Sequence, residues 1–148
     1  MANVYRDLHN AVKVNPLGIY PQAVGTTGAS NGVTTGIIDR RGYGGVEFIF
    51  GYGTIPSTTE TITPVVLECA TTGGTFTSVA DADLIGTEAA AGIAAGTRTS
   101  GSTKNVFKSV GYKGNQPYVK AKLYGVGTAT ALVSICPVLH TPRSLPPA

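Results

Sequence analysis

The sequence has no tryptophan, a single methionine and few charged residues, which make up 13% of its 148 positions. Charged side chains usually account for about a quarter of a soluble domain, and long helices depend on them together with leucine and glutamine. A helical bundle or coiled coil is therefore excluded, and a βαβ nucleotide-binding domain is not expected. Hydrophobic residues reach 42%, which supplies a core and argues against a disordered chain.

Glycine, threonine and β-branched residues dominate what is present. The 20 glycines and nine prolines divide the chain into short segments, and within these apolar residues often alternate with polar ones. Such alternation is typical of half-buried strands, and it places Val46, Phe48 and Phe50 on one face. Residues 80–95 are expected to form one helical turn at most, because two glycines interrupt their alanine-rich run. The expected strands are residues 19–24, 33–39, 46–50, 61–70, 76–79, 105–112, 118–124 and 128–139.

Short strands separated by turn residues every 8–12 positions predict an all-β domain. We expect a jelly-roll-like antiparallel β-sandwich of about eight strands over residues 19–139. Residues 1–18 are interpreted as an N-terminal arm, either extended or forming a short edge strand, and residues 140–148 as an extended proline-rich tail. The expected core includes Val46, Phe48, Phe50, Val65, Leu67, Val119, Leu123, Val133 and Ile135.

Charge and cysteine content limit the possible partners and compartments. The net charge of +3 is scattered, with Arg40-Arg41 as the one adjacent basic pair, so no specific nucleic acid is expected as a partner. No apolar run approaches the length of a membrane span or a secretory signal, which predicts a chain made in the cytoplasm without a membrane partner. Cys69 and Cys136 lie in apolar stretches and are expected to be buried and reduced, although the sequence leaves a disulfide between them open.

Three motifs resemble chemical sites, and each lacks part of its pattern. Ser30 lies in a Gly-x-Ser-x-Gly motif and His140 follows it, which leaves a small serine hydrolase as a remote alternative; the flanking residues do not predict the required strand and helix. Residues 96–103 have the glycine spacing of a phosphate loop without its lysine. Asp81 and Asp83 lack the further ligands of a calcium loop. We therefore expect no catalysis, no bound metal and no cofactor.

One resemblance rests on segments that are distributed over most of the length of the chain. They are Met-Ala-Asn-Val-Tyr-Arg-Asp-Leu-His-Asn-Ala-Val-Lys-Val at the start, residues 38–48, 76–86 and 110–114 with 118–119, and His140-Thr141-Pro142-Arg143. These segments resemble small virion proteins of tailed bacteriophages, and Thr141 departs from the family's tail motif. The resemblance implies a capsid decoration, or cement, protein with a jelly-roll-like sandwich that is made in the host cytoplasm and located on the capsid surface. Its implied partner is the major capsid protein. A head–tail connector, tail-completion or tail-tube component is the alternative.

The two chain ends are the expected contact surface with the shell or with neighbouring subunits. The N-terminal segment is too apolar for a free tail yet has no regular period, and the prolines of the tail favour an extended backbone. Self-association as a dimer or trimer is also expected, with the dimer favoured because two-fold assemblies are commonest. The expected interface residues are Tyr5, Arg6, Leu8, Val12, Lys13, Val14, His140, Pro142 and Arg143.

Overall fold

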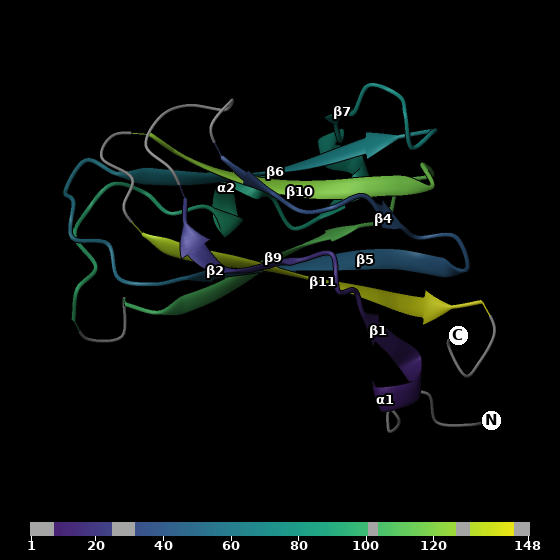
Figure 1. The fold of residues 1–148 in the computed structure, drawn as a ribbon, viewed down its shortest axis with the longest axis horizontal. Coiled ribbons are helices and arrows are strands. Elements are labelled where there is room, and N and C mark those ends of the chain that lie inside the picture. Colours follow the sequence, from purple (N-terminus) through teal and green to yellow (C-terminus); the bar gives the residue numbers. More distant parts are fainter. Residues whose placement is uncertain (1–7, 25–31, 101–103, 127–130, 144–148) are drawn as a thin grey trace.

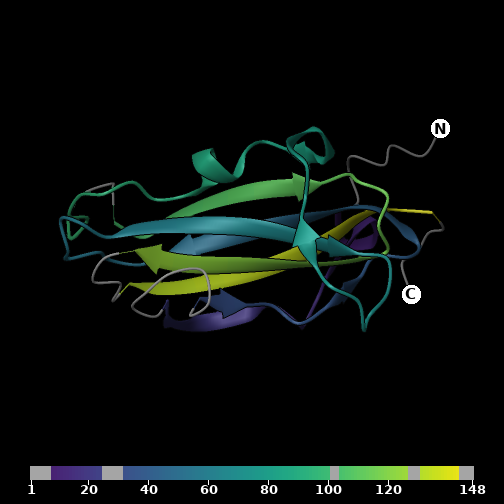
Figure 2. The ribbon, with the colours of Figure 1, turned by 90° about the horizontal axis from the view of Figure 1, so that it is seen from above.

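Two antiparallel sheets pack face to face in the computed structural model, which describes residues 8–24, 32–100, 104–126 and 131–143. Short helical turns lie beside the sandwich and do not form a layer of their own (Figures 1 and 2). They are α1 (Leu8–Ala11), the 3₁₀ turn η2 (Asp81–Asp83) and α2 (Glu88–Ala91). The predicted all-β sandwich is confirmed. Residues 80–95, expected to form one helical turn at most, contain the two short turns η2 and α2 with the two-residue strand β8 (Leu84–Ile85) between them.

The described residues contain eleven strands, more than the eight expected, because several are short pieces of one longer edge. The six-stranded sheet contains β1 (Val12–Val14), β2 (Ile19–Ala23), β5 (Tyr43–Tyr52), β8 (Leu84–Ile85), β9 (Val106–Tyr112) and β11 (Leu132–Pro142). The five-stranded sheet contains β3 (Val33–Thr34), β4 (Ile38–Asp39), β6 (Thr61–Cys69), β7 (Thr77–Ser78) and β10 (Tyr118–Val126).

The strand order is that of a jelly roll. β1 and β2 pair with successive stretches of β11 on the edge that faces away from β5, and β3 and β4 pair likewise with β10. Counting each pair as one strand gives the orders β2-β11-β5-β9 and β3-β10-β6-β7, with β8 added beside β9. The first strand thus lies beside the last, and the second beside the next to last, which is the nesting produced by two Greek keys.

The core fills the space between the sheets with the inward-facing residues of the long strands. Every second residue of β5, β10 and β11 is buried, as the period of a strand requires. The structure confirms burial for seven of the nine expected core residues: Val46, Phe48, Phe50, Val119, Leu123, Val133 and Ile135.

Val65 and Leu67 are the two wrong core assignments. Both are half-buried on the outer face of β6, and the buried positions are Ile62, Pro64 and Val66. The two faces of this strand are almost equally apolar, so alternation did not distinguish them. The charged residue Glu68 lies on the face of Val66 and made that face look like the solvent-exposed one. Glu68 does share the face of Val66, but it lies at the strand end, where its carboxylate accepts a hydrogen bond from the Tyr112 hydroxyl.

The cysteines are also less buried than expected. Cys69 and Cys136 are both free and half-buried. Cys69 belongs to β6 in the five-stranded sheet, whereas Cys136 belongs to β11 in the six-stranded sheet. Cys136 lies between the buried residues Ile135 and Pro137, and Cys69 shares the outer face of Val65 and Leu67, so neither thiol belongs to the core. The prediction of full burial was wrong because an apolar run does not show which residues of a strand point inward.

The sheets extend into both segments that were interpreted as arm and tail. Val12–Val14 form β1, the short-edge-strand alternative for the N-terminal segment, and pair with Val138–His140. β11 continues through His140 to Pro142, after which the Arg143 N–H donates to the Gly42 carbonyl at 2.8 Å. Residues from the two ends of the sequence are therefore held in adjacent strands (Figure 1).

The segment containing α2 packs against β6 and β9. The Glu88 carboxylate accepts a hydrogen bond from the Val66 N–H at 2.5 Å. β7 pairs with only Leu67 and Glu68 of β6, so Glu88 provides the acceptor for the next N–H along this edge. At the other end of α2, Lys108 donates to the carbonyls of Ala90 and Gly92. These contacts fix the segment on the sandwich although α2 has only one turn. No helix in the described part of the chain is both long and apolar enough to span a membrane.

Candidate interaction surface

The outer face of the six-stranded sheet has few charged side chains and several exposed or half-buried apolar ones, and we call it the apolar face. Residues opposite one another in antiparallel strands share a side, so the register defines its rows. Among the described outward residues of β5, β9 and β11, Glu47 is the one acid and no lysine or arginine is present. These residues are Glu47, Ile49 and Gly51 of β5, Phe107, Ser109 and Gly111 of β9, and Leu132, Ser134, Cys136, Val138 and His140 of β11.

One end of the apolar face joins the two chain ends, and we call it the terminal corner: Leu8, Val12, Val14, Val138 and His140. Val12 lies opposite His140 and Val14 opposite Val138, so both valines lie on the apolar face. Leu8 in α1 and Val14 are 68% and 62% exposed. The structure thus brings together expected interface residues that lie about 130 positions apart in the sequence.

The other expected interface residues lie around this corner or outside the described chain. Lys13 lies in β1 opposite Leu139, and Pro142 is the last residue of β11. Arg143 follows it and is exposed. Tyr5 and Arg6 lie outside the described residues, so their predicted role stays a prediction.

Two glycines shape the backbone beneath the terminal corner. A Cβ at Gly45 would lie 2.6 Å from His140 Cε1, so the imidazole can occupy its position only because residue 45 is a glycine. His140 Nδ1 lies 3.0 Å from the Thr141 hydroxyl. Thr141 has a φ of 55°, which is unusual for a β-branched residue, and its Cβ would be 3.0 Å from a Cβ at Gly44. The departure from the tail motif therefore falls at a strained residue.

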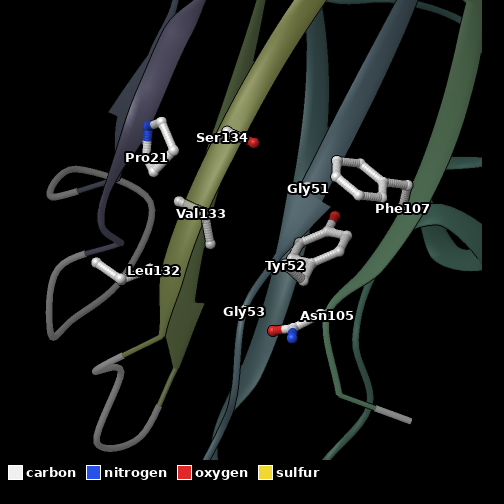
Figure 3. A pocket seen from close by; sticks show the side chains of 9 residues that line it. All are labelled: Pro21, Gly51, Tyr52, Gly53, Asn105, Phe107, Leu132, Val133 and Ser134. Atoms are coloured by element: carbon white, nitrogen blue, oxygen red, sulfur yellow. The ribbon is translucent and has the colours of Figure 1, made fainter. Parts of the chain in front are cut away.

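The opposite end of the apolar face contains a shallow trough of about 220 Å³. Phe107 lies on one side, while Pro21 and Leu132 lie on the other (Figure 3). Phe107 and Leu132 are 74% and 57% exposed, and their side chains are the apolar rims. Gly51 is in the floor, where a Cβ would lie 2.9 Å from Phe107 Cε1. The remaining lining residues are Tyr52, Gly53, Asn105, Val133 and Ser134.

The sequence pattern did not reveal this trough. Phe107 and Leu132 lie within the expected strands 105–112 and 128–139, and nothing in the pattern distinguishes them from other strand residues. The two side chains lie near each other because Gly51 of β5 pairs with Phe107 on one edge and with Ser134 on the other. Leu132 is two residues before Ser134 and lies on the same face. The available signal was the glycine itself, since a glycine within a strand often marks a close approach by neighbouring groups.

The outer face of the five-stranded sheet has a different character. Lys120 Nζ lies 4.2 Å from the centre of the Phe76 ring, and the Arg41 guanidinium lies 5.4 Å from that of Tyr118. Arg41 also forms a salt bridge with Asp39 at 2.5 Å, and its hydrogen bonds lower the pKa of that carboxyl. Two cationic groups on this face, Lys120 and Arg41, are thus covered by or paired with aromatic and acidic side chains of the same chain.

The motifs that suggested chemistry do not assemble a site within the described residues. Ser30 lies outside them, and the His140 ring is within hydrogen-bond distance of the Thr141 hydroxyl, so the hydrolase alternative stays untested. No group of three potential metal ligands occurs among the described residues. In the motif that resembles a calcium loop, the Asp83 N–H donates to the Ala80 carbonyl within the η2 turn. In the motif that resembles a phosphate loop, Arg98 forms two main-chain hydrogen bonds with Ile55.

No family model and no curated protein matches the chain. Support for a function therefore comes from the fold, the apolar face and the resemblance to phage virion proteins.

Proposed function

We propose that this chain is a structural protein of a tailed-bacteriophage particle, a capsid decoration protein that binds and stabilises the shell of major capsid protein. The observation that carries the proposal is the apolar face, whose described outward side chains on its three central strands include one acid and no lysine or arginine. Exposed apolar patches of this kind mark protein contacts, because soluble monomers rarely leave them uncovered. The jelly roll supports the proposal as a rigid scaffold of the kind that the resemblance implies.

The apolar face is large enough for a stable protein contact. Its four strand positions (β1 with β2, β11, β5 and β9) are about 4.8 Å apart and contain 36 residues, which at about 3.3 Å per residue gives a planar area of about 570 Å². A standard interface buries about 800 Å² of accessible surface on each partner, and accessible surface exceeds planar area. A single face of this sandwich therefore suffices for specific attachment.

The terminal corner is the proposed attachment point to the shell within this face. Leu8, Val12 and Val14 present apolar surface that folding has not covered. Lys13 and Arg143 lie at its margin, where an ion pair with an acidic group of a shell protein contributes only about 0–1 kcal/mol. Apolar contact and the avidity of many sites on one shell supply most of the binding free energy.

Exposed valines on the two sheets provide a matched test. The variant carrying Leu8→Ser and Val14→Ser removes the apolar surface of the terminal corner without touching the core. The control Val126→Ser changes a valine that is 50% exposed at the end of β10, in the other sheet. Point variants are preferable to removing residues 1–14, because that deletion would also remove β1.

Co-sedimentation with bare capsid shells measures the result. We expect the terminal-corner variant to bind at least tenfold more weakly than the wild type, while Val126→Ser binds unchanged. Equal saturation of the shells by all three proteins, each with an unchanged unfolding temperature, would show that this corner is not the attachment site.

A further inference from the structure

The trough at the far end of the apolar face has the dimensions of a site for a small ring. Its volume is about 220 Å³, whereas a buried apolar cavity of about 150 Å³ suffices to bind benzene. Phe107, Pro21 and Leu132 provide apolar walls, and Gly51 keeps the floor low. One or two proline rings would match this space.

The polar groups of the trough restrict the chemistry of its occupant. The Asn105 amide and the Ser134 hydroxyl are the side-chain polar groups of the lining outside buried Tyr52, whose hydroxyl already donates to the Ala91 carbonyl at 2.7 Å. Asn105 and Ser134 can both donate hydrogen bonds. A proline-containing backbone suits such a site, because proline keeps its carbonyl acceptor and has no N–H that would need a partner.

The chain itself contains such a segment in Leu145-Pro146-Pro147. Consecutive prolines restrict the backbone to extended, polyproline-like geometry, which lowers the entropy lost on binding, and aromatic-lined grooves recognise such segments. Leu145 adds an apolar side chain. The segment therefore offers the rings and the carbonyl acceptors that match the trough.

The segment cannot reach the trough of its own subunit. β11 runs from Leu132, at the trough, to Pro142, and its ten residue steps cover about 33 Å. The main chain at Arg143 is held by Gly42 at that far end. From Arg143 to Pro147 a fully extended chain spans at most about 14 Å. An occupied trough must therefore contain the segment of another copy.

We propose that the trough of one subunit binds the Leu145-Pro146-Pro147 segment of a second copy. The donor and the acceptor sites differ, so the contact is heterologous and links copies head to tail. A contact of this size is weak for one pair of molecules. It becomes effective when neighbouring copies are held side by side, because the local concentration of segments is then high. The association is a property of the chain alone and does not depend on the proposed phage shell.

A peptide of residues 140–148 tests the site directly. Titration of a variant truncated after Arg143, followed by NMR, should give saturable shifts at Phe107 and Leu132. Phe107→Ser should weaken peptide binding at least tenfold. The matched control Ile85→Ser, which changes an exposed residue on the same face outside the trough, should leave it unchanged. A peptide with both prolines replaced by alanine should bind at least tenfold more weakly.

Complementation between variants tests the head-to-tail arrangement. At high concentration the wild type should associate progressively in sedimentation velocity. The truncated protein, which keeps its trough, and Phe107→Ser, which keeps its segment, should each remain monomeric alone and form a 1:1 complex when mixed. Dimers of the truncated protein would indicate a face-to-face contact and overturn the proposal. Absence of peptide binding to the truncated protein would overturn it as well, whatever the outcome of the shell-binding experiment.

Discussion

Arg40 and Arg41 are adjacent in the sequence, yet the structure predicts opposite results when each is replaced by lysine. Arg40 is 8% exposed, whereas the Arg41 side chain is 67% exposed and pairs with Asp39. The Arg40 guanidinium stacks over the Tyr112 ring, 5.3 Å from its centre. It joins the turn after β4 to the loop before β10 through the carbonyls of Gln116 at 2.7 Å, of Tyr43 and Gly44 at 3.3 Å, and of Gly114.

The magnitude follows from the geometry of these four acceptors. A guanidinium presents five donors in a planar fork, whereas an ammonium is a single point and can serve about two of the four carbonyls. Each lost hydrogen bond from a charged donor costs about 1.5–3 kcal/mol, and the two contacts at 3.3 Å are at the weak end. Arg40→Lys should therefore lower the free energy of unfolding by about 3 kcal/mol, and Arg40→Ala by more.

Urea titration followed by far-ultraviolet circular dichroism measures this loss, and thermal unfolding provides a second reading. For a domain of this size we expect the midpoint temperature of Arg40→Lys to fall by about 6–12 °C. The control Arg41→Lys should remain within experimental error of the wild type. If Arg40→Lys were as stable as Arg41→Lys, the four carbonyls would not depend on the guanidinium, and the account of this junction would be refuted.

Three further predictions concern stability. Val66→Ala should cost about 2–3 kcal/mol, and Val65→Ala, on the outer face, less than half as much; equal losses in urea titrations would contradict the assignment of the two faces of β6. Burial raises the pKa of Glu88 above its usual 4.5, and the charge of Asp81 adds to the rise, so the free energy of unfolding should fall as pH rises from about 4.5 through the folded pKa. Glu88→Gln should remove this pH dependence. If the dependence persisted in the variant, another group would be responsible for it. Burial, with the hydrogen bond to Glu68, raises the pKa of Tyr112 to about 12. The stabilisation from this shift is present below pH 10 and should be lost between about pH 10 and 12. If this tyrosine is responsible, the free energy of unfolding of Tyr112→Phe should fall less over that range than that of the wild type.

Much of the fold could be predicted from local pattern. The alternation in β5, β10 and β11 identified their buried faces, and glycine and proline marked the ends of most strands. β6 failed because Val65 and Val66 are equally apolar, so only the packing of the whole strand decides which points inward. The sequence also could not distinguish Arg40 from Arg41, because burial of the first depends on a loop more than 70 residues away.

The candidate surface was predictable in part. Composition pointed to Leu8, Val12 and Val14, and the structure places the two valines beside Val138 and His140. The trough was not predictable, because it depends on the registers that align three strands distant in sequence. A surface formed by several strands can be predicted only when the pairing of those strands is known, whereas the buried face of a single strand can be predicted from its own alternation.

The copy number of the protein in purified particles of a phage that encodes it tests the central proposal most directly. Quantitative staining or mass spectrometry of such particles gives the ratio of this chain to the major capsid protein. A decoration protein that covers the shell should be present at a ratio of roughly one to one, or at a fixed simple fraction set by the lattice. A ratio corresponding to one ring per particle would indicate a connector or tail component, and absence from the particles would contradict a virion role altogether.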